Sequence, residues 1–202
     1  MAGDMTAWRG ALLVEGIAVQ DQFLSQCDVR ALIACASRRI AGGEFNPAGV
    51  GTDIRLQRRP EIRGDHTCWI VPPLFAAEKR LSARLEALRL DLNRAGYLGL
   101  FDLEWHYARY PPGAGYVRHV DQPFGGDERV VSIVLYLNAV WPADGGGQLR
   151  LFAAQGPRDI EPQAGRLVGF LTCGQEHAVL PTLRDRLSIS GWFRRRASTI
   201  SA

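Results

Sequence analysis

Lysine is almost absent from this sequence: Lys79 is the only one, and the other 23 of its 24 basic residues are arginines. Codon usage in a GC-rich genome accounts for most of this excess. The arginines are scattered along the 202 residues, and 21 acidic residues offset them to a net charge of +3. A nucleic-acid-binding surface is typically a concentrated basic patch, so we expect no nucleic acid among the partners of this protein.

Long apolar runs and paired cysteines are missing as well. No segment approaches the roughly 18 consecutive apolar residues of a membrane span, and residues 1–10 lack the basic and apolar regions of a secretory signal. The four cysteines, Cys27, Cys35, Cys68 and Cys173, form no CxxC pair, which is typical of reduced, mostly buried thiols. We therefore expect a cytoplasmic protein with no membrane partner, and its oligomeric state stays open.

The remaining composition is that of an ordinary globular protein, with 47% hydrophobic and 22% charged residues. The length suits one domain with a sizeable core, and no linker or repeat divides the chain. We expect supporting helices, strands and a lid loop in residues 1–100, a jelly-roll core in residues 101–194, and a frayed, arginine-rich tail in residues 195–202.

The first hundred residues carry helix signals. A short strand is predicted over Leu12–Gln20, followed by a helix over residues 21–43 with Asp21 as its N-cap. Leucines at helical spacing predict a second helix within residues 74–96. Between them, Glu44–Asp65 is rich in glycine, proline and arginine and has no sustained apolar period. It predicts a long loop with one short strand at most, of the kind that often forms a functional lid.

The second half has β-like runs separated by turn signals such as Pro-Pro-Gly and Asp-Gly-Gly-Gly. About eight runs favour a sandwich or barrel of the jelly-roll kind. The expected fold class is mainly β with flanking helices. The runs are Leu103–Tyr110, Gly115–Val120, Arg129–Leu137, Gln148–Phe152, Asp159–Glu161, Arg166–Leu171, His177–Leu180 and Asp185–Phe193.

His119 and Asp121 stand two residues apart in a strand-like stretch. Positions i and i+2 of a strand point to the same face, so this imidazole and carboxylate supply two ligands of a metal site. An isolated pair of this kind also arises by chance, as a core histidine or a surface pair. The other histidines are His66, His106 and His177. His177 is favoured as third ligand because it lies at a turn-to-strand junction in the sheet-rich half, and two histidines with one carboxylate are typical of non-haem Fe(II) oxygenases.

Arg186 is predicted to face the interior of the barrel. It shares one face of the last predicted strand with Ser188, Ser190 and Trp192, whereas the apolar residues between them face the helices. A buried guanidinium is costly unless an anion pairs with it, and its planar fork suits a carboxylate. That anion is either an internal Asp or Glu or a bound dicarboxylate cosubstrate, and the cosubstrate explains the arginine together with the metal site.

Further motifs surround these residues. They are Ile62–Asp65 (IRGD) with Trp69, Tyr110–Pro123 (YPPGAGYVRHVDQP), Tyr136–Asn138 (YLN), Gly145–Phe152 (GGGQLRLF), Asp159–Pro162 (DIEP), and His177 with Arg186 and Trp192. Together they resemble the Fe(II)/2-oxoglutarate-dependent dioxygenases, and most closely the prolyl hydroxylase domain enzymes that modify hypoxia-inducible factor and their bacterial relatives. The resemblance covers residues 62–193 and implies a double-stranded β-helix core. The spacing from Tyr110 to His119 is one residue shorter than in the animal enzymes, but no ligand is lost.

The resemblance also implies roles for matching residues. The ligands of Fe(II) would be His119, Asp121 and His177. The keto and C1 carboxylate groups of 2-oxoglutarate would chelate the same metal, leaving one position for O2. Arg186 would pair with the distal carboxylate of 2-oxoglutarate, helped by the Tyr136 hydroxyl, and Tyr110 would lie near the chelating end. Turnover would release succinate and CO2, with ascorbate as the reductant that keeps the iron active.

Three residues are expected to bind substrate. In the resembled enzymes Arg129 and Asp65 lie around the substrate entrance, where they would either pair and tie the lid loop to the barrel or remain ordinary surface charges. Trp192 would pack against a substrate proline, against the distal histidine, or simply in the core. His106 is interpreted as structural, although its strand face places it near the pocket, and His66 as loop surface.

We therefore expect an Fe(II)- and 2-oxoglutarate-dependent hydroxylase of prolyl residues in a protein substrate. Elongation factor Tu is a candidate on analogy with the bacterial relatives. Two alternatives stay open: a small-molecule 2-oxoglutarate-dependent hydroxylase, and a non-catalytic jelly-roll module that retains a metal. The first differs only in its substrate, and the second would release no succinate.

Overall fold

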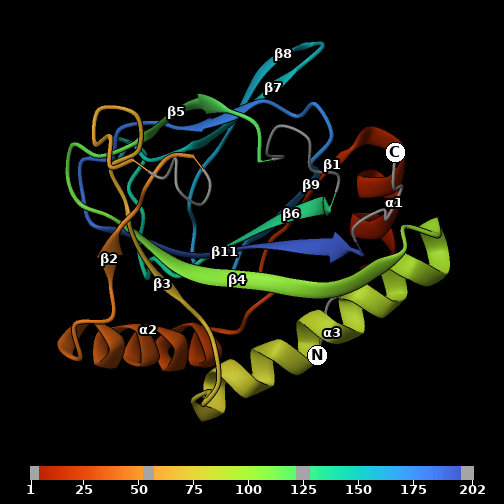
Figure 1. The fold of residues 1–202 in the computed structure, drawn as a ribbon. Coiled ribbons are helices and arrows are strands. Elements are labelled where there is room, and N and C mark those ends of the chain that lie inside the picture. Colours follow the sequence, from red (N-terminus) through yellow and green to blue (C-terminus); the bar gives the residue numbers. More distant parts are fainter. Residues whose placement is uncertain (1–4, 52–56, 122–127, 197–202) are drawn as a thin grey trace.

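Two antiparallel sheets lie face to face, and the helices cover the outer side of the larger sheet (Figure 1). The computed structural model describes residues 5–51, 57–121 and 128–196. The larger sheet has the strand order β1-β9-β6-β11-β4-β3-β2, and the smaller sheet has the order β5-β10-β7-β8. The prediction of a double-stranded β-helix with flanking helices is confirmed.

Within the described residues the chain forms eleven strands and three helices. The strands of the larger sheet are β1 (Ile17–Gln20), β2 (Asn46–Pro47), β3 (His66–Trp69), β4 (Leu100–Tyr110), β6 (Arg129–Tyr136), β9 (Leu167–Leu171) and β11 (Arg186–Arg195). Those of the smaller sheet are β5 (Tyr116–His119), β7 (Leu149–Ala153), β8 (Gly156–Ile160) and β10 (His177–Val179). The helices are α1 (Met5–Glu15), α2 (Gln26–Ala41) and α3 (Ala76–Gly96).

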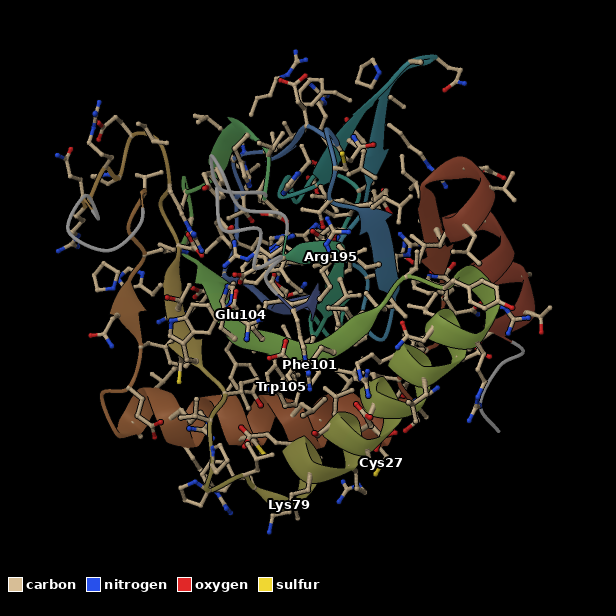
Figure 2. All side chains as sticks on the ribbon, turned by 45° about the vertical axis from the view of Figure 1, so that its right-hand side comes forward. Cys27, Lys79, Phe101, Glu104, Trp105 and Arg195 are labelled. Carbon is tan, nitrogen blue, oxygen red and sulfur yellow. The ribbon has the colours of Figure 1, made fainter. Side chains whose placement is uncertain are left out.

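The central strands of the larger sheet use their two faces differently. Figure 2 shows Glu104 and Trp105 on opposite sides of β4, with Trp105 toward the helices. On β11, Ile189 is fully buried in the core beneath the sheet, as the sequence pattern predicted, and Phe193 is buried there too. The opposite faces of β4, β6 and β11 line a cavity between the two sheets. Alternation along each strand thus separates the core from the site.

A buried ion-pair cluster joins the helices to the sheet. Arg39 of α2 donates from Nε and Nη2 to the two carboxylate oxygens of Glu78 in α3, each at 2.9 Å, and from Nη1 to Glu44 at 2.6 Å. The Tyr107 hydroxyl of β4 donates to Glu78 at 3.1 Å. Burial opposes ionisation of Glu78, but the Arg39 hydrogen bonds outweigh it and lower the pKa of the carboxyl. Every member of this cluster has a partner inside the protein.

The start of the chain differs from the prediction. Only Ile17–Gln20 of the predicted first strand is extended, because α1 continues through Leu12, which is fully buried, and ends before Gly16 at φ +77°. The next helix begins at Gln26 rather than near Asp21. Its N-cap is Ser25, whose hydroxyl accepts from the Asp28 backbone N–H at 3.1 Å.

Two predictions, a frayed tail over residues 195–202 and a loop-surface position for His66, are wrong at least in part. β11 continues to Arg195, and Arg194 donates to Asp102 at 2.7 and 2.9 Å, so the chain is not frayed there. The remainder of the predicted tail, residues 197–202, lies outside the described residues, as does the centre of the lid, residues 52–56. His66 lies in β3 and pairs with Arg109 of β4, not in a surface loop.

The cysteines are less buried than predicted. Cys35 and Cys68 are buried, but Cys27 and Cys173 are exposed, and all four are free thiols. Figure 2 shows Cys27 and Lys79 on the outer side of the helix layer. No helix within the described ranges has both the length and the apolar character that a membrane crossing requires.

Candidate active site

Three predicted metal ligands come together in the cavity. His119 ends β5 and His177 begins β10, and the two are direct partners in the smaller sheet. The Nε2 atoms of His119 and His177 lie 3.7 Å and 3.5 Å from the Asp121 carboxylate oxygens. One ligand atom from each residue fits within 4.8 Å of the others. Two imidazoles and a carboxylate converging on one point are a chemically suitable donor set for Fe(II).

Backbone carbonyls orient both imidazoles. His119 Nδ1 lies 2.7 Å from the Val117 carbonyl oxygen, and His177 Nδ1 lies 3.3 Å from that of Gln175. A proton on each Nδ1 donates to these oxygens and leaves the Nε2 lone pair facing the cavity. Histidine ligands are commonly fixed in this way, because the second nitrogen sets the tautomer and the ring plane.

The third ligand is oriented by a hydroxyl. Ser132 of β6 donates to the Asp121 carboxylate at 2.7 Å, and its oxygen lies 3.3 Å from the Thr172 hydroxyl. Ser132 and Thr172 are both buried. One carboxylate oxygen is therefore held from the larger sheet while the histidines approach from the smaller one.

Packing sets the charge states of the three ligands. Burial opposes ionisation of Asp121, but attraction to His177 and His119 holds the pKa of its carboxyl well below the ordinary value. Burial lowers the pKa of the His119 imidazole. For His177, burial also favours the neutral ring, but the Asp121 carboxylate outweighs it and raises the pKa. The carboxylate is ionised at neutral pH, as a metal ligand must be.

Arg186 occupies another part of the same cavity and is only 1% exposed. Its Nε donates to the Gly147 carbonyl oxygen at 2.8 Å, and its Nη1 donates to the Ser188 hydroxyl at 3.3 Å. Gly147 has φ +68°, and a Cβ there would lie 3.0 Å from the Arg186 Cδ, so this approach requires glycine. Within the described ranges, no carboxylate pairs with the guanidinium.

Two tyrosines flank that guanidinium. Its central carbon lies 5.0 Å from the Tyr110 ring centre and 5.1 Å from that of Tyr136. Burial raises the pKa of both phenols, so each keeps its proton at neutral pH. The buried Tyr136 hydroxyl has no hydrogen-bond partner among the described residues. An unpaired cation beside an unpaired hydroxyl fits the carboxylate of a ligand, so the residues present suit a metal and an organic acid together.

The two charged residues expected at the entrance do not pair with each other. Asp65 accepts from Arg63 at 2.7 and 3.0 Å, because Arg63 precedes it by two residues. Arg129 donates from Nε to Glu104 at 3.0 Å and from Nη1 to the Asp121 backbone oxygen at 3.1 Å. Within this part of the described structure, Arg129 is thus anchored to β4 and to the metal-ligand segment rather than to the lid.

Trp192 lines the cavity beside Arg129 and is 7% exposed, and these two residues are called the rim below. The Arg129 guanidinium carbon stands 3.7 Å from the centre of its ring, a cation–π contact. Its described ring neighbours are His106 at 5.4 Å and Trp69 at 6.4 Å, rather than the distal His177. His106, interpreted as structural, lines the cavity.

Sequence reasoning missed several residues that support the site. Ser132, Tyr116, Gly147 and Glu104 hold ligands or rim residues in place; the Tyr116 ring, for example, stacks on His119 at 3.5 Å. A signal was present for Ser132, which interrupts an apolar run at even spacing from Tyr136. The Tyr116 and Glu104 contacts join separate strands, so no local pattern indicates them.

Residues 105–194 match the model of the 2OG-Fe(II) oxygenase superfamily. The chain is similar to Egl nine homolog 1 of Homo sapiens, with 36% identity over 144 residues, which is 66% of this chain and 33% of that protein. The chain thus spans about a third of the length of this curated relative.

Two solved structures are similar over nearly the whole chain. One is a Pseudomonas putida prolyl-4-hydroxylase, with 47% identity and a TM-score of 0.88, covering 95% of this chain and 99% of that one. The other is a Trichoplax adhaerens prolyl hydroxylase in complex with a peptide fragment of the hypoxia inducible factor oxygen degradation domain. It has 28% identity and a TM-score of 0.82, covering 93% of this chain and 87% of that one.

Proposed function

This chain belongs to the 2OG-Fe(II) oxygenase superfamily, and from that premise we propose that it hydroxylates a prolyl residue of a protein substrate. The observation that carries the proposal is the content of one cavity. It holds the His119, Asp121 and His177 donor set together with the buried cation of Arg186, which has no anionic partner among the described residues. The reaction couples hydroxylation to the release of succinate and CO2 from 2-oxoglutarate.

Each residue of the site has a defined part in this reaction. His119, Asp121 and His177 would hold Fe(II), which together with 2-oxoglutarate would supply the chemistry of O2 activation. The imidazole rings are held by the carbonyls behind them, and Ser132 fixes the Asp121 carboxylate. These contacts set the orientation of the donors before any ligand arrives.

The polar groups at the arginine end bind the cosubstrate. Arg186 forms a charge-assisted pair with the distal carboxylate of 2-oxoglutarate, and the Tyr136 hydroxyl donates to the same group. Tyr110 lines the cavity with its ring beside the guanidinium. Burial of these side chains excludes water from the bound acid and strengthens the ion pair.

The rim binds the substrate. Trp192 lines the cavity beneath the Arg129 guanidinium, and Trp69, with its ring centre 6.4 Å from that of Trp192, is 48% exposed. Asp65 is only 2% exposed and would act through Arg63, which it binds and which lines the cavity. A half-exposed tryptophan next to a cation–π pair offers an apolar surface to a segment of peptide. This exposed rim supports a protein substrate over a small molecule enclosed by the cavity. Residues 1–202 would then act as one catalytic domain.

The finer assignments follow the bacterial relatives. We infer a cytoplasmic enzyme that takes ascorbate as reductant, and elongation factor Tu is the first substrate to examine. The decisive experiment incubates the protein with iron, ascorbate, 2-oxoglutarate and purified bacterial elongation factor Tu, followed by proteome extract, and searches for a +16 Da mark on proline by mass spectrometry. His119→Ala is the control that removes a metal ligand.

The outcomes separate the candidate functions. A mark on proline that is absent with His119→Ala supports the prolyl assignment. Succinate release without any marked protein would point to a small-molecule substrate. The absence of both products from a protein that binds iron and 2-oxoglutarate would overturn an enzymatic function.

A further inference from the structure

His106 has properties that neither the metal site nor the cosubstrate site explains. It lies at the centre of β4, is 2% exposed, and lines the same cavity as the three metal ligands. Its cross-strand partners are Trp69 of β3 and Ser190 of β11. Paired residues in neighbouring antiparallel strands point to the same face of a sheet, so the ring faces the cavity rather than the helices.

Two tryptophans fix the His106 ring. Its centre lies 4.9 Å from the Trp69 ring and 5.4 Å from the Trp192 ring, with interplanar angles of 56° and 31°. Arg129 covers Trp192 with its guanidinium carbon at 3.7 Å. The imidazole is therefore locked by packing, which is how a binding group is kept in a defined orientation.

The His106 imidazole has no hydrogen-bond partner in the part of the chain that the structure describes. Among the described residues, neither Nδ1 nor Nε2 of His106 has one, and the buried Nε1–H of Trp192 beside it has none either. Buried polar groups in proteins are nearly always paired, and an exception that faces a cavity indicates a partner brought by a ligand. Two neighbouring side chains with this property mark a second polar subsite, separate from Arg186 and Tyr136.

The charge state of His106 determines which kind of ligand group it can bind. Burial, followed by the positive charge of Arg63, lowers the pKa of the imidazole to about 4. The neutral ring offers one N–H donor, and the indole of Trp192 offers only a donor. Two uncharged donors on adjacent rings suit a single neutral acceptor with two lone pairs, such as a carbonyl oxygen.

The substrate has one such oxygen near its reacting ring. The nitrogen of a prolyl residue carries no hydrogen, so the carbonyl oxygen of that residue is its own polar group nearest to the site of hydroxylation. We propose that His106 and Trp192 together bind the carbonyl oxygen of the substrate prolyl residue and so position its ring before the metal site. This inference rests on the proposed prolyl substrate and assigns His106 as a positioning residue.

The test uses a minimal probe of that carbonyl. N-acetyl-L-proline methylamide is titrated into the protein carrying 2-oxoglutarate and Zn(II) in place of iron, and binding is followed by NMR through the indole N–H signal of Trp192. N-acetylpyrrolidine, which has the ring but lacks the prolyl carbonyl, is the matched probe. We expect the first probe to bind and shift the Trp192 signal, and the second to bind more weakly.

Variants then isolate the contribution of His106. His106→Phe keeps a flat ring without a donor and should weaken binding of the methylamide about tenfold. His106→Gln retains an N–H donor and should recover part of that loss. His66→Phe, a matched change in the adjacent strand, should have no effect. Affinity for 2-oxoglutarate, measured by calorimetry, should stay unchanged in all three variants.

Two results would overturn the inference. One is equal affinity of the methylamide for the wild type and His106→Phe, and the other is failure of the wild type to bind it up to its solubility limit. The proposed function fails separately, because it requires a +16 Da product. If the methylamide binds but no hydroxylated product forms, the carbonyl subsite is supported and the proposed function is contradicted. If hydroxylation occurs but the methylamide does not bind, the carbonyl subsite is contradicted.

Discussion

Two buried arginines, one beneath the larger sheet and one above it, are treated differently by the fold. Arg39 is 5% exposed and donates to both carboxylates around it, Glu78 and Glu44. Arg186 is 1% exposed and reaches a backbone carbonyl and a serine hydroxyl, with no carboxylate partner among the described residues. The first charge is neutralised by carboxylates of the protein, whereas no residue in the described ranges neutralises the second.

The difference distinguishes a structural charge from a functional one. Burying an ion requires a compensating partner, whatever its purpose. Where Asp or Glu supplies that partner, the cluster joins helices to the sheet. Where no Asp or Glu supplies the partner, a bound ligand must provide the negative charge, and the site therefore has affinity for an organic acid. The exposed fractions of these two arginines are similar and do not distinguish them. What distinguishes them is whether a carboxylate of the protein balances the charge.

Removing the unbalanced charge should have the largest effect. Arg186→Met should raise the KM for 2-oxoglutarate by roughly 100-fold or more, because two charge-assisted hydrogen bonds of about 1.5–3 kcal/mol each are lost. Folding stability should be unchanged or higher, since an unpaired buried charge disappears. Succinate release against 2-oxoglutarate concentration, together with urea unfolding, measures both. Arg186→Lys, which keeps the charge without the fork, should fall between. Unchanged affinity for 2-oxoglutarate would contradict the comparison.

Removing the balanced charge should reverse this pattern. Arg39→Met leaves Glu78 buried without its cation and should lower the free energy of unfolding by about 3–5 kcal/mol. The KM for 2-oxoglutarate of the folded fraction should not change. The double variant Arg39→Met with Glu78→Gln should recover part of the stability, because both charges are gone. A loss well below 1 kcal/mol on urea unfolding would show that Arg39 is not the balanced charge we describe.

His106, a neutral group in the same cavity, is expected to make the free energy of unfolding depend on pH. The pKa of His106 is about 4 when folded, against an ordinary value of 6.5. Between pH 6.5 and pH 4 the His106 ring is therefore protonated in the unfolded chain but neutral in the folded protein. This difference lowers the free energy of unfolding as the pH drops from about 6.5 to 4, by roughly 3 kcal/mol in total. Below pH 4 both states are protonated and the loss is complete.

His106→Phe isolates that contribution. Its free energy of unfolding should depend less steeply on pH across this window than that of the wild type, when urea unfolding is followed from pH 7 to 4. The other carboxyls and histidines titrate in both proteins and cancel in the difference. Parallel pH curves would show that the His106 ring is not held neutral by burial.

Local sequence patterns predicted which of the central side chains face the cavity. The position of Arg186 followed from alternation in β11, and that of His119 and Asp121 from their two-residue spacing. The strands of the second half lie within a few residues of their predicted bounds. These predictions succeeded because a strand with one buried face records its geometry in the order of its residues.

Contacts between distant segments were beyond such patterns. Arg129 binds Glu104 rather than Asp65, a choice that depends on which strands are neighbours. Ser132 donates to Asp121 across the cavity. His106 was interpreted as structural, and only its contacts with Trp69 and Trp192 indicate a binding role. The helix α1 was not predicted at all, because Leu12 fits an apolar strand as well as a buried helix turn and was assigned to the strand.

The register of β11 also limits how this protein can evolve. Ser188 lies opposite Tyr136 and Ile189 opposite Leu135, one pair facing the cavity and the other facing the core. A single inserted or deleted residue in this strand would exchange the two faces, burying the anion-binding arginine among leucines. Insertions and deletions can therefore accumulate in turns such as that between β7 and β8, while β11 changes only by substitution.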